Sequence, residues 1–558
     1  MALRLALAAR GLLLRPFARL LRPALLLLLP VAAAAAALRL LPLAAAHGIH
    51  GAAATATLWS LFLLLAAAAA VAIKRRDRAR RLTLESTAHG SVRWGDPAPL
   101  RRPAGLVVGE HAGELLRFDG EAHVLSIAPT GSGKGVGAVF PNLLDYPGAV
   151  VVTDIKGENH AVTARYRRDV LRQPVEALDP FDLVGGNARY NPLDLIDPSR
   201  ADAYDLARLI ASMLVVPEPG SREPFWDDEA ASLVAGIVLY VALVADPADR
   251  HLGTVRHYLT LSPSQFKTLL RKMAATDACF GLIRRAANRI AQKEARLLSG
   301  VLASTNRHTE LLDSPNLLPT LTASTFSMAD LKRSPRTLYL VLPPHHLRAH
   351  GRWLRLLVAC ALRVLTSTPG RPPRNVLFLL DEFAVLGRME VVEEAIAYAR
   401  SFGISIWMLV QDLSQLREVY RNSWETLLAN TRVKQAFGTA DDATAEYLSR
   451  LTGQATVRVE TLNRSTGTAT GRGWLGQRQH GSAHNFGETA RRLLLPDEVR
   501  RLPADRQLLF ISGELPLLTN RPDYRRRPEL AERADPNPLY HRPGTAPARP
   551  AQHPPRDT

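Results

Sequence analysis

The stretch from Ser126 to Gly137 reads SIAPTGSGKGVG and carries residue types that bind phosphate. It nearly matches the loop pattern G-x-x-x-x-G-K-[ST], in which backbone N–H groups cradle phosphates and the lysine contacts them. Ala128 replaces the first glycine, and Gly135 replaces the residue whose hydroxyl normally contacts magnesium. The sequence therefore predicts a nucleotide site whose magnesium shell lacks one usual ligand.

Two further polar clusters follow apolar runs that are typical of buried strands. In NVLFLLDEF the run Val376–Leu380 ends at Asp381 and Glu382, which is a Walker B pattern. In ISIWMLVQD the run Ile404–Val410 ends at Gln411. In folds with this motif order, the strand ending at Gln411 lies between the Walker A and Walker B strands. Each of these patterns alone can occur by chance, but their order along the chain favours a nucleotide hydrolase.

The expected roles of these residues follow from their charge. Lys134 would bridge the β- and γ-phosphates of ATP, and Asp381 would hold Mg²⁺ through water. Glu382 would orient and deprotonate the attacking water, and Gln411 would sense the γ-phosphate. The residues expected to line the phosphate cradle are Ala128, Pro129, Thr130, Gly131, Ser132, Gly133, Lys134 and Gly135.

The elements that position these residues belong to an α/β domain. From about Gly90 onward, short β-branched runs alternate with helical patterns, which predicts a mainly parallel sheet. HVLSIA leads into the phosphate loop, and GAVVVTD forms a strand that ends at Asp154. For Asp154, Lys156 and Glu158, a capped helix start and a role in the site fit equally well.

The first 80 residues have the composition of a membrane anchor. Apolar stretches cover residues 24–46 and 53–73, each close to the roughly 20 residues that a transmembrane helix needs. Five arginines precede the first stretch and KRRDRARR follows the second, whereas the connector HGIHG has no Lys or Arg. This pattern predicts two spans with both ends cytoplasmic. A cleaved signal peptide is the alternative. The run Ala230–Ala245 is too short to span and predicts a buried helix.

Composition favours an anionic partner. The 558 residues include 70 Lys and Arg against 52 Asp and Glu, a formal charge of +18. Such a balance suits nucleic acid or phospholipid, although it also arises from compositional bias. Cys279 and Cys360 lie among apolar residues, as expected of free buried thiols.

Two segments have no core-forming pattern. Residues 464–485 are rich in Gly, Ser, Thr and His, which predicts a mobile loop. Residues 520–558 are dense in Pro and Arg, which predicts a disordered tail.

An ordered series of motifs resembles the TraG-type coupling proteins of type IV secretion systems, which are RecA/FtsK-class P-loop ATPases. The series is HGSVRWGD, APTGSGKGVGAVFPNLL, VVTDIKGENHAVTARYR, FWDDEA, LLDEFAVLG, QDLSQLREVY, FGTADDATAEYLSRLTG and LLLPDEVRRLP, and it covers most of residues 90–513. The family commonly has glycine after the loop lysine, so the resemblance makes Gly135 a shared trait.

The resemblance implies an architecture and an assembly. A RecA-like domain would cover residues 81–200 and 324–519, with an all-α domain inserted at 201–323. Residues 1–80 would anchor the chain in the inner membrane. A homo-hexamer would bind ATP between subunits, with Arg400 reaching a neighbour's nucleotide.

The function implied is an ATPase that passes a relaxase-bound DNA strand, protein effectors, or both to a type IV secretion channel. One alternative keeps the motor but transfers only protein. Another is a docking receptor in which nucleotide stabilises assembly with little hydrolysis. FtsK-like chromosome pumps share the motor but usually carry more spans and a C-terminal DNA-reading domain.

Overall fold

The protein is described by a computed structural model that covers residue 60 and residues 87–217, 224–468 and 478–540. These residues form two units, one containing 456–489 and the other containing 92–455 and 490–540. The second unit contains the nucleotide-site residues predicted from the sequence. The two predicted transmembrane spans lie outside the described residues except at Ser60. Within the described ranges, no helix combines the length and apolar character of a membrane span.

An eleven-stranded sheet forms the centre of the larger unit, and it is mainly parallel, as predicted. Seven neighbouring strands, in the order β9-β3-β8-β7-β4-β6-β5, run parallel, and β12, β13, β1 and β2 continue the sheet beyond β9 with antiparallel pairs. The strands are β1 Leu106–His111, β2 Glu114–Phe118, β3 His123–Ile127, β4 Val150–Asp154, β5 Val175–Leu178, β6 Thr337–Val341, β7 Val376–Leu380, β8 Ile404–Val410, β9 Thr431–Ala436, β12 Arg506–Ile511 and β13 Leu517–Asn520.

Helices cover both faces of this sheet, as the continuous apolar runs require. Alternate residues of one strand belong to different cores, so that Leu377 and Leu379 of β7 face one core and Phe378 faces the other. The helices are α3 Phe140–Asp145, α4 Glu158–Arg165, α5 Ala203–Leu214, α6 Pro224–Val244, α7 Leu252–Leu259, α8 Pro263–Ala274, α9 Leu282–Ala291, α10 Ala295–Thr309, α11 Asp330–Arg333, α12 Leu347–Ser367, α13 Glu390–Tyr398, α14 Leu413–Tyr420, α15 Trp424–Asn430, α16 Asp442–Leu451, α17 Pro496–Arg500 and α18 Pro528–Ala531.

The helix after the phosphate loop begins irregularly. Residues Gly135–Val139 form a π-helical turn, and α3 follows with Pro141 in its first turn, where a missing N–H costs little. The buried Asn142 side chain clamps α3 to β1, because Nδ2 donates to Val107 O at 2.9 Å and Oδ1 accepts from Val107 N at 2.8 Å. Tertiary contacts therefore hold a segment of low helical propensity.

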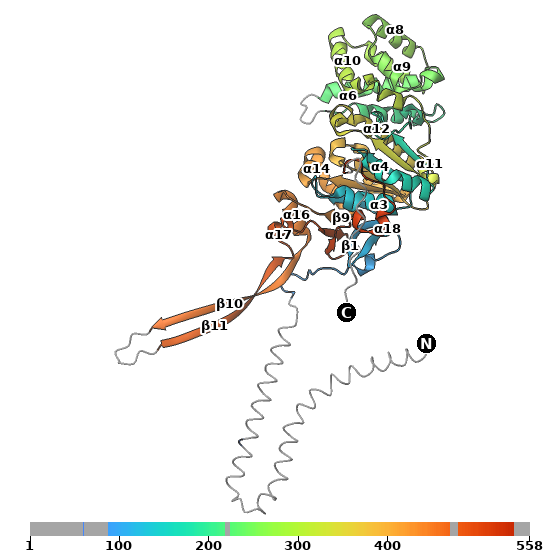
Figure 1. Cartoon of the computed structure of the whole chain (residues 1–558). Helices are drawn as coiled ribbons and strands as arrows, with labels where there is room; N and C mark the ends of the chain where they lie inside the picture. The colour runs from blue at the N-terminus through green and yellow to red at the C-terminus, as the bar shows by residue number, and fades with distance from the viewer. Residues whose placement is uncertain (1–59, 61–86, 218–223, 469–477, 541–558) are drawn as a thin grey trace, which may run out of the picture. The chain divides into compact units, whose positions relative to one another are not determined.

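The segment between β5 and β6 is helical, as the family architecture implied. Helices α5 to α10 lie there, and Figure 1 shows α6, α8, α9 and α10 gathered at one end of the larger unit. The apolar run at 230–245 falls mostly in α6 and is largely buried, in agreement with its predicted core role. Asp227 of the FWDDEA motif, 4% exposed, contacts His308 Nε2 of α10 at 2.8 Å.

The prediction of a mobile loop at 464–485 is wrong for its described part. Strands β10 (Gln454–Thr468) and β11 (Arg478–Arg492) pair with each other in a two-stranded sheet of their own (Figure 1). Their polar, Gly-rich composition has no apolar alternation, which is the pattern that marks a strand in a sequence.

The predicted disordered tail is also wrong over residues 521–540, here called the C-terminal strap. Tyr524 and Leu530 of the strap are 7% and 0% exposed, and Tyr524 meets the Phe140 ring edge-on at 5.3 Å. Two of its arginines pair with acids far away in the sequence, since Arg527 Nη1 lies 3.0 Å from Glu110 Oε2 and Arg533 Nη1 lies 3.3 Å from Asp145 Oδ1. The strap therefore belongs to the α/β unit, which extends past the predicted limit at residue 519.

Candidate nucleotide-binding site

The predicted site residues meet at the carboxyl edge of the parallel strands. The phosphate loop follows β3, Asp381 and Glu382 follow β7, and Gln411 follows β8. Strand β8 pairs with β3 on one side and with β7 on the other, which confirms the expected strand order. The order matters because it brings a polar strand end between the lysine loop and the acidic pair.

The loop from Ala128 to Gly135 has the backbone of a phosphate cradle. Gly131 and Gly133 have φ values of 80° and 90°, a region that favours glycine. Ala128 N donates to Val410 O at 2.9 Å, and Ser132 N donates to Pro129 O at 3.2 Å. These bonds tie the loop to β8 and close it as a turn ahead of the helical N–H groups.

Three side chains from different elements form a hydrogen-bonded group. Lys134 Nζ donates to Glu382 Oε1 at 2.9 Å, and Gln411 Nε2 donates to Glu382 Oε2 at 3.0 Å. The Lys134 and Glu382 side chains are 10% and 21% exposed, so water screens their charges only in part. Both Glu382 oxygens are thus directed between the loop lysine and the polar end of β8.

Glu382 also has an unusual backbone. Its φ is 50° and its ψ is 46°, in the left-handed region. A non-glycine residue there costs about 1–2 kcal/mol. Strain of this kind gathers at functional sites, where it fixes the direction of a side chain.

Asp381 has the position and surroundings of a metal-binding carboxylate. Its Oδ1 accepts from Glu382 N at 3.0 Å, and its backbone O accepts from Thr153 Oγ1 at 3.0 Å. Burial raises its pKa to about 6; Lys134 lowers the pKa and Glu382 raises it further. A cation near the carboxylate would favour its charged form.

Asp154, at the end of β4, lies beside this group. It is 1% exposed, and burial raises its pKa to about 7; the charges of Asp381 and Glu158 act in the same direction. Its pattern in the sequence, an apolar strand ending in an acid, is the same signal that marked Asp381.

Arg400 lies at the amino ends of the parallel strands, whereas the phosphate loop lies at their carboxyl ends. It belongs to the short helix Ala399–Phe402 that precedes β8, and its charge acts on His123, the first residue of β3. It is therefore separate from the phosphate loop of its own chain, and its role toward a neighbouring subunit stays a prediction.

Sequence reasoning missed two residues that shape the loop. Arg521 of the C-terminal strap donates through Nη1 to Gly133 O at 3.2 Å and lies over the Phe437 ring, 5.7 Å from its centroid. At Gly438, a Cβ would lie 2.7 Å from the Cβ of Ser132. The FGTADD motif signalled Gly438, whereas Arg521 lies in a segment whose composition suggested disorder.

These residues fit a magnesium–nucleotide complex. Gly131 has open space where a side chain would project, so the loop presents bare backbone. Asp154 Oδ1 is buried without a hydrogen-bond partner among the described residues. Across the described ranges, no three His, Cys, Asp or Glu residues are grouped as a complete metal site. The residues that would hold the nucleotide and its metal are Lys134, Asp381, Glu382 and the loop amides.

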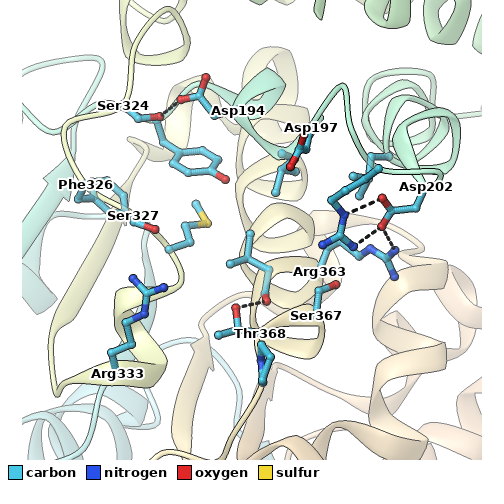
Figure 2. A pocket seen from close by; sticks show the side chains of 17 residues that line it. Asp194, Asp197, Asp202, Ser324, Phe326, Ser327, Arg333, Arg363, Ser367 and Thr368 are labelled. Atoms are coloured by element: carbon cyan, nitrogen blue, oxygen red, sulfur yellow. Dashed lines mark hydrogen bonds and ion pairs between the residues drawn. The ribbon is translucent and has the colours of Figure 1, made fainter. Parts of the chain in front are cut away.

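A cavity of about 530 Å³ lies elsewhere in the unit, against α5 and α12. Figure 2 shows its polar wall, where Asp202 accepts from Arg200 and Arg363, and Ser324 donates to Asp194. No residue of the phosphate loop lines this cavity. Its arginines are paired with carboxylates, Arg200 and Arg363 with Asp202 and Arg333 with Asp330.

Comparisons with known proteins agree with the motif series. The chain is 29% identical over 449 residues to the conjugal transfer protein TraG of Escherichia coli, a match covering 75% of this chain and 69% of that protein. It is 27% identical to protein VirD4 of Rhizobium radiobacter, covering 78% of this chain and 64% of that one. The solved structure of the plasmid coupling protein TrwB in complex with ADP and Mg²⁺ shares the fold, with a TM-score of 0.56, 18% identity and coverage of 76% and 91%.

The family model for Type IV secretory system Conjugative DNA transfer matches residues 83–542, most of the chain. The matched residues include the phosphate loop, Asp154 at the end of β4, Asp381 and Glu382 after β7, the helices α5 to α10 and the C-terminal strap. This chain belongs to the Type IV secretory system Conjugative DNA transfer family.

Proposed function

We propose that this chain is a membrane-anchored coupling ATPase that delivers DNA-bound or protein substrates to a type IV secretion channel. The observation that carries the proposal is the contact of Glu382 with both Lys134 and Gln411. A general base must lie within hydrogen-bond reach of its reaction partners, and a lysine and an amide on either side fix it there.

Each residue then has a defined task toward ATP. The loop amides would bind the β-phosphate, and Lys134 would leave Glu382 to contact the phosphate oxygens. Freed of the lysine, Glu382 would accept a proton from water held by Gln411. Bound magnesium would neutralise phosphate charge, with Asp381 holding it.

The cargo proposed first is a relaxase-bound single DNA strand. The formal charge of +18 and membership of a conjugative DNA transfer family support it. Protein substrates are compatible with the same motor. A docking receptor without hydrolysis is favoured only by Gly135, and the Lys134–Glu382–Gln411 group argues against it.

The proposed location is the inner membrane, with two spans at residues 24–46 and 53–73 and both ends cytoplasmic. The proposed assembly is a homo-hexamer in which Arg400 acts on the neighbouring subunit. Arg400 precedes β8, whereas the phosphate loop follows β3, and this placement is compatible with action in trans.

Turnover by Glu382→Gln in the full chain tests the proposal. ATP binding should persist, because Lys134 and the loop amides that would contact the phosphates are unchanged, while hydrolysis should fall by about 100-fold or more. Glu394→Gln, an exposed carboxylate of α13, is the matched control. Unchanged turnover in Glu382→Gln would show that this carboxylate is not the base.

Single-stranded DNA is added to the same assay at low and high salt. Stimulation that is lost at high salt is expected if backbone phosphates bind the protein. Without stimulation, and with effector proteins bound to the helical region, protein-only transfer would replace the first cargo.

A further inference from the structure

Because Gly135 has no hydroxyl, another group must complete the magnesium shell. The register of the strands indicates that Asp154 is in a position to do so. Strands β4 and β7 are parallel neighbours, with Val152 opposite Leu379. Two residues further along each strand, Asp154 and Asp381 end on the same face of the sheet, because side chains alternate with a period of two. This is the face that α3 and α4 cover and on which the phosphate loop leads into its helix.

The contacts of Asp154 account for only one of its two oxygens. Oδ2 accepts from His160 N at 2.8 Å, while Oδ1 has no partner among the residues the structure describes. The residue is 1% exposed. A buried acceptor without a partner costs free energy, so such an atom usually faces a ligand, an ion or an ordered water.

A purely structural role explains less. Helix α4 has Gly157 at its N-terminal cap, and a cap needs only the oxygen that His160 N already uses. The nearby carboxylate of Glu158 has partners of its own, since Asn537 Nδ2 donates to it at 2.8 Å and Lys156 Nζ lies 3.7 Å away. Among the residues that the structure describes, Asp154 Oδ1 is thus an acceptor without a partner, on the same face of the sheet as Asp381.

We infer that Asp154 is a second carboxylate of the magnesium site, which holds metal-bound water beside Asp381 in place of the hydroxyl that Gly135 lacks. The inference rests on the proposed function. A carboxylate at the end of β4 can take this position because Mg²⁺ keeps several of its waters and is bound through them by few protein groups. Asp154 is a positioning residue here, since it acts on the metal through water.

Metal binding can be measured without turnover. The full chain in detergent is loaded with a non-hydrolysable ATP analogue and titrated with Mn²⁺, and free Mn²⁺ is followed by electron paramagnetic resonance. Asp154→Asn should weaken Mn²⁺ binding by about 10-fold or more, the effect typical of outer-shell partners. Binding of the analogue without metal should not weaken, because the amide keeps the bond from His160 N.

Asp179→Asn is the matched control. Asp179 follows β5, two strands from β4, and it too is buried, with one oxygen bonded by Val184 N and the other without a partner among the described residues. Its substitution should leave Mn²⁺ binding unchanged. Equal losses in both variants would mean damage to the sheet edge and would overturn the inference.

Gly135→Ser supplies the missing hydroxyl and makes the test specific. A Cβ at Gly135 would lie 3.4 Å from Phe140, an ordinary contact, so serine fits. In the Asp154→Asn background it should restore most of the lost Mn²⁺ affinity. An Asp154→Asn protein that binds Mn²⁺ like the parent overturns the inference alone; a parent that binds neither analogue nor Mn²⁺ overturns the proposed function as well.

Discussion

Position 137 requires glycine because the side chain of Arg521, a residue far away in the sequence, packs against it. A Cβ there would lie 2.6 Å from Cγ of Arg521, whose guanidinium is held by Gly133 O and Ala504 O. The helical backbone itself would accept alanine. Positive φ values therefore favour glycine at positions 131 and 133, and the Arg521 side chain leaves no room for a Cβ at positions 133 and 137.

This explanation predicts a non-additive pair of substitutions. Gly137→Ala should lower the free energy of unfolding by about 1–3 kcal/mol, since overpacking forces Arg521 from its place. With Arg521→Ala already present, Gly137→Ala should instead stabilise by up to about 1 kcal/mol through its higher helical propensity. Urea unfolding of the four proteins measures the coupling. Additive effects would show that Arg521 does not set the requirement.

How far the sequence could predict the site depends on where each signal lies. Asp381, Glu382 and Gln411 end apolar strands, so local pattern placed them correctly at one sheet edge. The left-handed backbone of Glu382 could not be predicted, because glutamate has no preference for that conformation. Arg521 was missed because its partners, such as Gly133, are hundreds of residues away in the sequence. The Pro/Arg-rich composition around it does not indicate such distant contacts.

At the scale of elements, β3 and β8 are joined by a buried histidine as well as by their backbones. His123 Nδ1 accepts from Ile406 N at 3.0 Å, and the His123 side chain is 0% exposed. Burial, and next the charge of Arg400, lower the pKa of His123 from 6.5 to about 4. The neutral ring is thus part of how these two strands hold together.

Acid should weaken this junction over a defined range. The unfolded chain binds a proton to His123 below about pH 6.5, and the folded chain does so only near pH 4, so stability falls as pH drops through this range. The full loss is about 3 kcal/mol. His123→Gln, which keeps an acceptor for Ile406 N, should remove this part of the pH dependence. The difference between parent and variant, measured by urea unfolding at pH 7 and pH 4, isolates the histidine from the acids that titrate nearby.

At the scale of the whole molecule, the C-terminal strap joins parts of the α/β unit made long before it. It packs on α3 through Tyr524 and pairs with α4 through Arg165 and Asp535, whose Nε and Oδ1 are 2.6 Å apart. Leu530 is fully buried. The helix that carries the phosphate loop is therefore covered by the last described part of the chain.

Truncation should reveal this contribution. A chain ending at Asn520 should lose several kcal/mol of stability, since burial of a Tyr or Leu side chain contributes about 1.5–3 kcal/mol each. It should also bind ATP more weakly, because Gly133 loses Arg521. A chain ending at Tyr540 keeps every strap contact among the described residues and is the matched control. Equal stability of the two truncated chains, measured by thermal unfolding, would contradict the assignment.

The contact of Arg521 with Gly133 also bears on the order in which the protein is made. The two residues are 388 positions apart, so at about 5–20 residues per second a ribosome adds Arg521 roughly 20–80 s after the phosphate loop. Strand β3 likewise waits for β8 and β9, both of which follow the long helical segment. A nascent chain therefore carries a phosphate loop that lacks its contact with Arg521 until the strap has been made.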